Sequence, residues 1–185
     1  MAHRVTLHRL RADDEEEFVH LARLSVRLHG DWVRTPTNST TFREYLERFA
    51  DPSQNEALLV RRIGTGEAAG LVTLTGIVRG PFDRAVAGFC AFAPAAGQGL
   101  MTEGVGLAVR HGFGPLGLHR IEADVQPGNA RSRRLVERLG FRREGFSPEF
   151  IRIGGVWRDH ERWAITAGMP VRDLTDIRTD HRRRR

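Results

Sequence analysis

The sequence contains no lysine, because all 29 of its basic residues are arginine. Schiff-base chemistry, P-loop nucleotide binding and Ser–Lys catalysis each require a lysine, so the sequence excludes these three classes. Cysteine is nearly absent as well, and the single Cys90 excludes an internal disulfide and a metal site built from several cysteines. The apolar neighbours of Cys90 predict a small core residue. No run of about 18 apolar residues is present, so no contact with a membrane is expected.

The composition that remains is typical of a globular protein. The chain has 185 residues, of which 40% are hydrophobic, and this is enough for one domain with a full core. The N-terminal segment lacks the apolar centre of a signal peptide, so we expect a cytoplasmic protein. No metal ion is expected. We predict one domain over residues 1–169 and an Arg-rich, flexible C-terminal tail over residues 170–185.

The formal net charge is +6, and the densest basic run is RTDHRRRR, residues 178–185. A terminal charge run is typically a solvated tail. The alternative is an arm that binds nucleic acid or the ribosome. Because the chain has no recognisable nucleic-acid-binding motif, an Arg-rich nucleic-acid-binding protein is the distant alternative. Salt-sensitive retention on heparin that disappears with the last six residues would indicate an effect of the tail alone.

Hydrophobic periodicity predicts strands and helices in the order β-α-α-β-β-β-α-β-α-β-β. The predicted strands cover residues 4–10, 56–63, 69–78, 85–93, 118–126, 141–153 and 156–166. The predicted helices cover residues 13–29, 40–49, 100–112 and 130–139. The first helix is expected to bury an apolar side made by Phe18, Leu21, Leu24, Val26 and Leu28, and the third a face made by Met101, Val105, Ala108, Val109 and Gly112.

The segment AAGQG, residues 95–99, lies between a predicted strand and a predicted helix. The first N–H groups of a helix have no partner within it and favour anions, and glycines at 97 and 99 let a phosphate approach the backbone closely. A plain strand-to-helix turn is the alternative. The segment GFGPLG, residues 112–117, matches a dinucleotide-binding pattern, but it follows a helix and precedes a strand, so it is predicted to be a helix-ending loop.

Four segments of the chain carry a family resemblance: IVRGPF, GQGLMTEG, LHRIEADVQPGNARSRRLVERLGFRREG and GGVWRDH. In their order and spacing, over roughly residues 5–167, the chain resembles the GNAT acyltransferases. Within them it is similar to the ribosomal-protein-alanine N-acetyltransferases of the RimJ/RimL type, on the RimJ side. One departure is Pro94, which stands where the family usually has Gln or Arg.

The resemblance implies an α/β fold with a mixed (α+β) central sheet flanked by helices, in which two parallel strands splay apart to hold acetyl-CoA. In this chain those strands are residues 85–93 and 118–126. The pantetheine arm would run along the backbone, and the pyrophosphate would bind the glycine loop. The implied cofactor-binding residues are Phe89, Ala91, Ala93, Gly97, Gln98, Gly99, Leu100, Met101, Thr102, Asn129 and Ser132. No other cofactor is expected.

The same resemblance suggests the catalytic and acceptor-binding residues. Asp124 and Glu122 are the candidate general bases, although a salt bridge to one of the many arginines is the alternative for either acid. Ser132 or water would protonate the departing thiolate. Asn129 has N-capping as its alternative or additional role. The acceptor side is assigned to Trp32, His119, Trp157 and Asp159, with structural roles as the alternatives.

The implied function is acetyl-CoA-dependent acetylation of a protein N-terminal α-amine, with the N-terminal alanine of a ribosomal protein as the expected acceptor. An α-amine has a pKa of about 7.7–8.0 against about 10.4 for lysine, so a useful neutral fraction exists at neutral pH. The alternative within the same fold is acetylation of a small amine such as an antibiotic or a polyamine. Contact with the ribosome through the Arg-rich surface and a monomeric or homodimeric state are further expectations.

Overall fold

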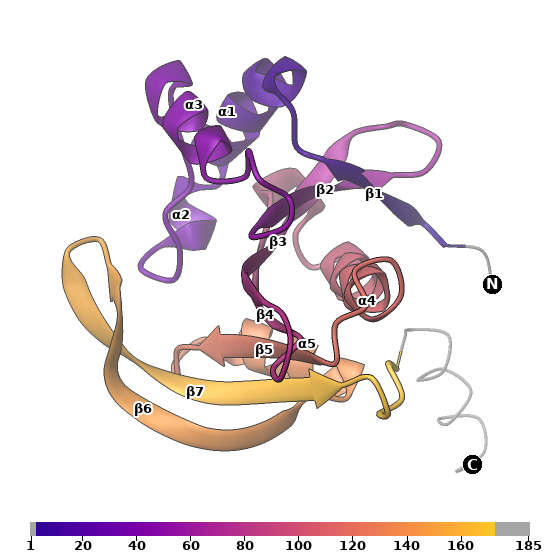
Figure 1. Ribbon diagram of the computed structural model, residues 1–185. Coiled ribbons are helices and arrows are strands. Elements are labelled where there is room, and N and C mark those ends of the chain that lie inside the picture. Colours follow the sequence, from indigo (N-terminus) through magenta and orange to yellow (C-terminus); the bar gives the residue numbers. More distant parts are fainter. Residues whose placement is uncertain (1–2, 173–185) are drawn as a thin grey trace, which may run out of the picture.

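The computed structural model describes residues 3–172, which form a seven-stranded sheet flanked by helices (Figure 1). The strands are β1 (Val5–Arg9), β2 (Glu56–Arg62), β3 (Ala68–Val78), β4 (Arg84–Ala91), β5 (Arg120–Val125), β6 (Arg142–Ile153) and β7 (Val156–Thr166). The helices are η1 (Ala12–Asp14), α1 (Glu15–Leu24), α2 (Val26–His29), α3 (Ser39–Glu47), η2 (Ala93–Ala95), α4 (Leu100–Phe113) and α5 (Ala130–Leu139), where η marks a 3₁₀ helix.

The strands lie in the order β1-β2-β3-β4-β5-β7-β6. Neighbouring strands of this sheet are antiparallel except β4 and β5, which are parallel and connected through α4. The predicted α/β fold with a mixed sheet is therefore confirmed. The segment 112–117 closes α4 and leads into β5, as predicted for a helix-ending loop.

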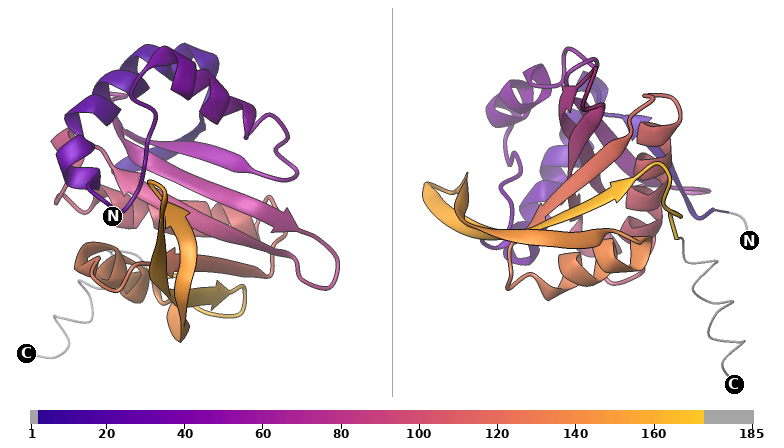
Figure 2. Two further views of the ribbon diagram at one scale, coloured as in Figure 1. Left: turned by 90° about the vertical axis from the view of Figure 1, so that its left-hand side faces the viewer. Right: turned by 60° about the horizontal axis from the view of Figure 1, so that its bottom comes forward.

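Helices cover both faces of the sheet (Figures 1 and 2), and the core consists of two clusters, one on each face. On one face, α4 and α5 pack against the strands, and Val109 and Ile121 are fully buried there. On the other face, α1 and α3 cover the β2–β4 part, where the ring of Phe18 contacts those of Phe42 and Phe92. The helices on this second face leave the β5–β7–β6 part uncovered (Figure 1).

The packing of α4 against the sheet explains its glycine at 104, and the lone cysteine lies in the core cluster on the opposite face. All of the residues predicted for the buried face of α4 are buried: Met101, Val105, Ala108, Val109 and Gly112. A Cβ at Gly104 would lie 2.6 Å from the methyl carbons of Val60, so glycine is required for the close approach of α4 to β2. Cys90 is buried, and burial raises the pKa of its thiol to about 12, as expected for a core residue.

The single helix predicted over residues 13–29 is wrong, because the chain breaks at Ser25 into α1 and α2. The buried Ser25 hydroxyl donates to the Leu21 carbonyl at 2.6 Å and accepts the Ala93 N–H at 2.9 Å. This contact with the first residue of η2 lies at the point where α1 ends. Leu24 and Val26, predicted to be on the apolar side, are 54% and 55% exposed.

The β6–β7 hairpin is long, curved and projects from the body of the protein (Figures 1 and 2). Its turn is Gly154-Gly155, both at positive φ. Within residues 3–172, no helix is long and apolar enough to span a membrane.

The predicted tail run RTDHRRRR lies outside the described residues. The segment before this run is described up to Arg172. The Arg172 N–H donates to the Leu139 carbonyl at 3.1 Å, and Arg110 donates to the Val171 carbonyl at 3.1 Å. The chain after β7 thus returns to the end of α5, and the domain boundary at residue 170 stays a prediction.

Candidate active site

The parallel strands β4 and β5 pair only at one end. Arg84, Ala85 and Val86 of β4 pair with Arg120, Ile121 and Glu122 of β5. Beyond these pairs β4 continues to Ala91 beside β3, and β5 continues to Val125 beside β7, without further pairing between them. The two strands therefore diverge toward their carboxyl ends, in the splayed arrangement that the sequence predicts.

Beyond Val86, the edge of β4 that faces β5 has backbone N–H and carbonyl groups that do not pair with β5. Phe92 donates to the Ala69 carbonyl at 2.9 Å, so alternation along the antiparallel β3–β4 pair turns the backbone of Phe89 and Ala91 toward β5. The Ala91 carbonyl accepts a hydrogen bond from His29 Nε2 at 2.9 Å. The Ala93 N–H, as described above, donates to Ser25. Of the three predicted pantetheine-contacting positions, Ala91 and Ala93 thus already have contacts from the α1–α2 segment.

The AAGQG loop, residues 95–99, leads from the segment after β4 into the start of α4. Gly97 and Gly99 have φ of 78° and 76°, which glycine adopts without strain. The first hydrogen bond of α4 runs from the Glu103 N–H to the Gly99 carbonyl at 3.3 Å, and no side chain caps the helix. The N–H groups of residues 100–102 therefore have no acceptor within α4, and the positive end of the helix dipole favours an anion beside them.

Gln98, between the two glycines, is held by three contacts. Its side-chain amide donates to the Pro94 carbonyl at 3.0 Å, Arg62 Nη2 donates to its side-chain oxygen at 2.8 Å, and Arg4 Nη1 donates to its backbone carbonyl at 3.1 Å. At Pro94, where the family usually has Gln or Arg, this chain thus uses a backbone carbonyl, which accepts a hydrogen bond from the Gln98 side chain. Sequence reasoning missed Arg4 and Arg62, because strand pairing brings them to the loop from distant parts of the chain.

The two acids predicted as general bases both contact arginine. Glu122 lies 2.7 Å from Arg120, 3.3 Å from Arg84 and 3.5 Å from Arg162. Asp124 Oδ1 lies 2.6 Å from Arg162 Nε, and the Asp124 side chain is 7% exposed. Burial raises the pKa of Asp124 above its ordinary value, and the Arg162 guanidinium limits that rise. The ion-pairing alternative is present in the structure, and the role of either acid as a base stays a prediction.

Asn129 and Ser132 lie at the start of α5, next to the carboxyl end of β5. The Asn129 side-chain oxygen accepts the Ser132 N–H at 3.1 Å, so Asn129 is the N-cap of α5. Ser132 is partly exposed in the first turn. The capping role is thereby established, and a contact of either residue with pantetheine or with the reacting sulfur stays a prediction.

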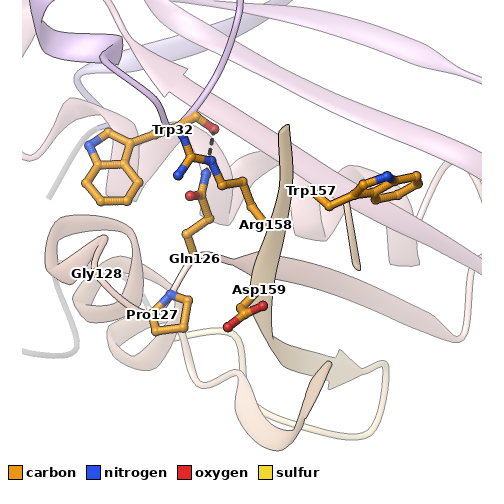
Figure 3. A pocket seen from close by; sticks show the side chains of 7 residues that line it. All are labelled: Trp32, Gln126, Pro127, Gly128, Trp157, Arg158 and Asp159. Atoms are coloured by element: carbon orange, nitrogen blue, oxygen red, sulfur yellow. Dashed lines mark hydrogen bonds between the residues drawn. The ribbon is translucent and has the colours of Figure 1, made fainter. Parts of the chain in front are cut away.

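A pocket of about 290 Å³ opens beyond the carboxyl end of β5 (Figure 3). It is lined by Trp32, Gln126, Pro127, Gly128, Trp157, Arg158 and Asp159. Three of the four residues predicted for the acceptor side, Trp32, Trp157 and Asp159, therefore meet here. The fourth, His119, precedes β5 at its opposite end, where its N–H donates to the Asp83 carbonyl at 2.6 Å. The structure does not bring His119 together with the other three.

Gln126 fixes one wall of this pocket. Its side-chain amide is buried and donates to the carbonyls of Asp31 at 3.1 Å and Trp32 at 3.4 Å, which ties the loop after α2 to the end of β5. Sequence reasoning missed Gln126 and Arg158. Arg158 stands between Trp157 and Asp159, and Gln126 lies within the segment LHRIEADVQPGN, so the motifs themselves were the available signal.

A family model described as an acetyltransferase (GNAT) domain matches residues 4–142 of this chain. The chain belongs to the GNAT acetyltransferase family. The ribosomal protein uS5-alanine N-acetyltransferase of Escherichia coli is 37% identical over 100 residues, which are 54% of this chain and 52% of that protein. The chain spans about half the length of the curated relatives it matches.

Solved GNAT structures share the fold. RimJ of Mycobacterium smegmatis in complex with CoA-disulfide has a TM-score of 0.83 and 24% identity, with 96% of this chain and 90% of that chain covered. A spermidine N-acetyltransferase of Vibrio cholerae in complex with CoA and spermine has a TM-score of 0.75 and 23% identity, with 88% and 95% covered. The predicted GNAT fold and the similarity to the RimJ type are confirmed.

Proposed function

We propose that this GNAT protein transfers an acetyl group from acetyl-CoA to an amine. The observation that carries the proposal is the separation of β4 from β5 beyond their three paired positions, together with the uncapped amino end of α4 that follows β4. A pyrophosphate fits that helix end, because its N–H groups lack acceptors and Gly97 adds no side chain there. Two arginines at the loop support this choice further, since Arg4 and Arg62 both contact Gln98, although Arg4 also pairs with Glu103 in the first turn of α4.

The chain supplies groups for the steps of a direct transfer. Acetyl-CoA, when bound, provides the thioester carbonyl that a neutral amine attacks. We assign to Asp124, whose pKa is raised by burial, the role of accepting the proton that the amine loses. Ser132 or water returns a proton to the departing thiolate. Arg162 keeps the Asp124 carboxylate in position through their 2.6 Å contact.

The acceptor that we propose is a protein N-terminal α-amine, with the N-terminal alanine of a ribosomal protein as the specific case. The similarity to the uS5-alanine N-acetyltransferase supports it. The charges at the site support it as well, because each nearby acid has a partner. Glu122, Asp124 and Asp31 contact arginines, and Asp159 accepts the Glu149 N–H at 2.8 Å. A polycation would have to replace these contacts.

Acetylation of a small amine is the second candidate function. The observation in its favour is the structural likeness to the spermidine N-acetyltransferase, together with Trp32 and Asp159 in one pocket, since an aromatic ring and a carboxylate can hold a cation. A cytoplasmic location, a ribosome contact and a monomeric or homodimeric state remain part of the proposal. Salt-dependent retention on heparin, with and without residues 180–185, tests the ribosome contact.

The donor site is tested by Gly97→Val with Gly66→Val as a matched control. Both glycines have nearly the same backbone, with φ of 78° and 76°, and a Cβ at either position meets no atom within 4 Å. Both substitutions should therefore lower the melting temperature by similar backbone strain. CoA should still raise the melting temperature of Gly66→Val, by mass action, and should not stabilise Gly97→Val. Equal stabilisation of both variants by CoA would contradict the donor site.

A further inference from the structure

Arg158 is the charged side chain that reaches across the pocket beyond β5. Figure 3 shows it extending from β7 toward Trp32, whereas Trp157, the residue before it, extends away. The side chain is 36% exposed, and its only ion pair within residues 3–172 is a long one, 3.5 Å from Nη2 to Asp31 Oδ2. A guanidinium in this position offers planar donors to whatever enters the pocket.

The Arg158 Nε is buried and has no hydrogen-bond partner among residues 3–172. Arg162 Nε is buried too, but it lies 2.6 Å from Asp124 Oδ1. A buried donor without an acceptor destabilises its site, so an oxygen that hydrogen-bonds to the Arg158 guanidinium would be held there.

The backbone carbonyls near Arg158 do not supply the missing acceptor. The carbonyls of Asp31 and Trp32 already accept from Gln126. One part of the remaining wall is apolar, because Trp32 packs on Gly128, where a Cβ would lie 3.1 Å from the indole, and Pro127 lies beside them. Asp159 also lines the pocket, and its carboxylate accepts the Glu149 N–H at 2.8 Å. The pocket thus combines the Arg158 guanidinium, whose contact with Asp31 is long, with a small apolar surface and the Asp159 carboxylate.

We propose that Arg158 binds the first carbonyl oxygen of the acceptor and so makes the enzyme specific for α-aminoacyl groups. The proposal rests on the proposed acetyl transfer to an amine. In a peptide N-terminus the carbonyl follows the α-amine by one carbon, and a small side chain branches from the same carbon. The carbonyl fits Arg158, and a small side chain fits the surface of Trp32 and Pro127. A polyamine has no oxygen for Arg158 and brings a charge that it repels.

The test compares two acceptors and three proteins. The acceptors are a peptide that begins with alanine and its analogue in which an (E)-alkene replaces the first peptide bond, which keeps the shape and removes the carbonyl. The proteins are the wild type, Arg158→Gln and Arg152→Gln. Arg152 is an exposed arginine of the same hairpin outside the pocket, so its variant controls for lost charge.

Arg158→Gln should lower kcat/KM for the peptide about 10- to 100-fold, the range for losing a hydrogen bond from a charged group, and leave the alkene analogue unchanged. Arg152→Gln should affect neither acceptor. Equal losses on both acceptors, or none, would overturn the role of Arg158 while leaving acetyl transfer intact. Wild-type protein that binds CoA but acetylates no amine would refute the proposed function itself. The CoA-induced melting shift, unchanged in Arg158→Gln, verifies that this variant folds.

Discussion

At the scale of residues, the ion pair of Asp124 on β5 with Arg162 on β7 carries the proposed acid–base chemistry. If Asp124 accepts the amine proton, Asp124→Asn should lower kcat about 100-fold or more, as is typical for loss of a general base, with little change in CoA binding. Because the pKa of Asp124 is raised, the wild-type rate should fall at acid pH as the carboxylate is protonated, and the variant should lack this acid limb. Steady-state rates between pH 5 and 9 provide the comparison. Wild-type turnover of Asp124→Asn would move the role to Glu122 or to solvent.

His29 links the loop after α2 to the edge of β4 and makes stability depend on pH. Its Nε2 donates to the Ala91 carbonyl at 2.9 Å, since a carbonyl can only accept, so Nδ1 of the neutral ring accepts from the Thr35 hydroxyl at 3.1 Å. Burial lowers the pKa of His29, and the bond to Ala91 offsets part of the effect. Below the unfolded pKa of about 6.5 the unfolded chain therefore binds a proton that the folded chain does not.

The sign of the effect follows from this difference in bound protons. The contribution of His29 to stability is complete above pH of about 6.5 and decreases as the pH falls through the lower folded pKa. His29→Gln, which does not titrate, should lose less stability than the wild type between pH 7 and pH 5. His20→Gln, at an exposed histidine, is the control. Thermal unfolding at several pH values measures it, and identical pH slopes for the wild type and His29→Gln would refute the argument.

Some residue roles could be predicted from the sequence and others could not. The glycines at 97 and 99 and the cap at Asn129 depend on neighbours in the chain, so local rules found them. The pairing of Asp124 with Arg162 depends on the register of β5 against β7, which no local pattern contains. The same holds for the contact of Arg62 with Gln98, and for His29 with Ala91.

At the scale of elements, α3 and α5 begin in the same way, and this separates stability from function. Asn38 caps α3 by accepting the Thr41 N–H at 2.9 Å, and Asn129 caps α5 by accepting the Ser132 N–H at 3.1 Å. Each substitution to alanine should lower the free energy of unfolding by about 1 kcal/mol. If Asn129 also contacts pantetheine, only Asn129→Ala should weaken CoA affinity, as isothermal titration would show. Equal CoA affinity in both variants would leave Asn129 as a cap alone.

The order of the elements was predictable because their hydrophobic periods are clear. The failure at α1–α2 has a specific cause, which is that Ser25 is bound to η2, just after β4, and this contact overrides the helical pattern of its neighbours. That contact places the following loop, with Trp32, beside the end of β5. A local pattern cannot express such a constraint, although it decides one wall of the pocket.

At the scale of the whole molecule, β4 and β5 separate at the boundary between the covered and the uncovered half of one sheet face (Figure 1). α1 and α3 cover the β2–β4 part, and the uncovered β5–β7–β6 part carries the ion-paired acids (Figure 1). The donor side could be predicted because its loop is continuous in sequence. The acceptor pocket could be predicted only in part. The family resemblance named Trp32, Trp157 and Asp159, but no local pattern shows that the loop after α2, the end of β5 and the start of β7 meet.

Acetyl transfer to an N-terminal α-amine is the central claim, and a direct competition tests it. The protein receives acetyl-CoA with equal concentrations of an Ala-starting peptide, its N-blocked lysine-containing analogue and a panel of small amines that includes spermidine, and mass spectrometry follows each product. The Ala-starting peptide should be acetylated fastest, since its amine has the lowest pKa, about 7.7–8.0, and the acids of the site are already paired. Faster acetylation of spermidine or another small amine would contradict the claim.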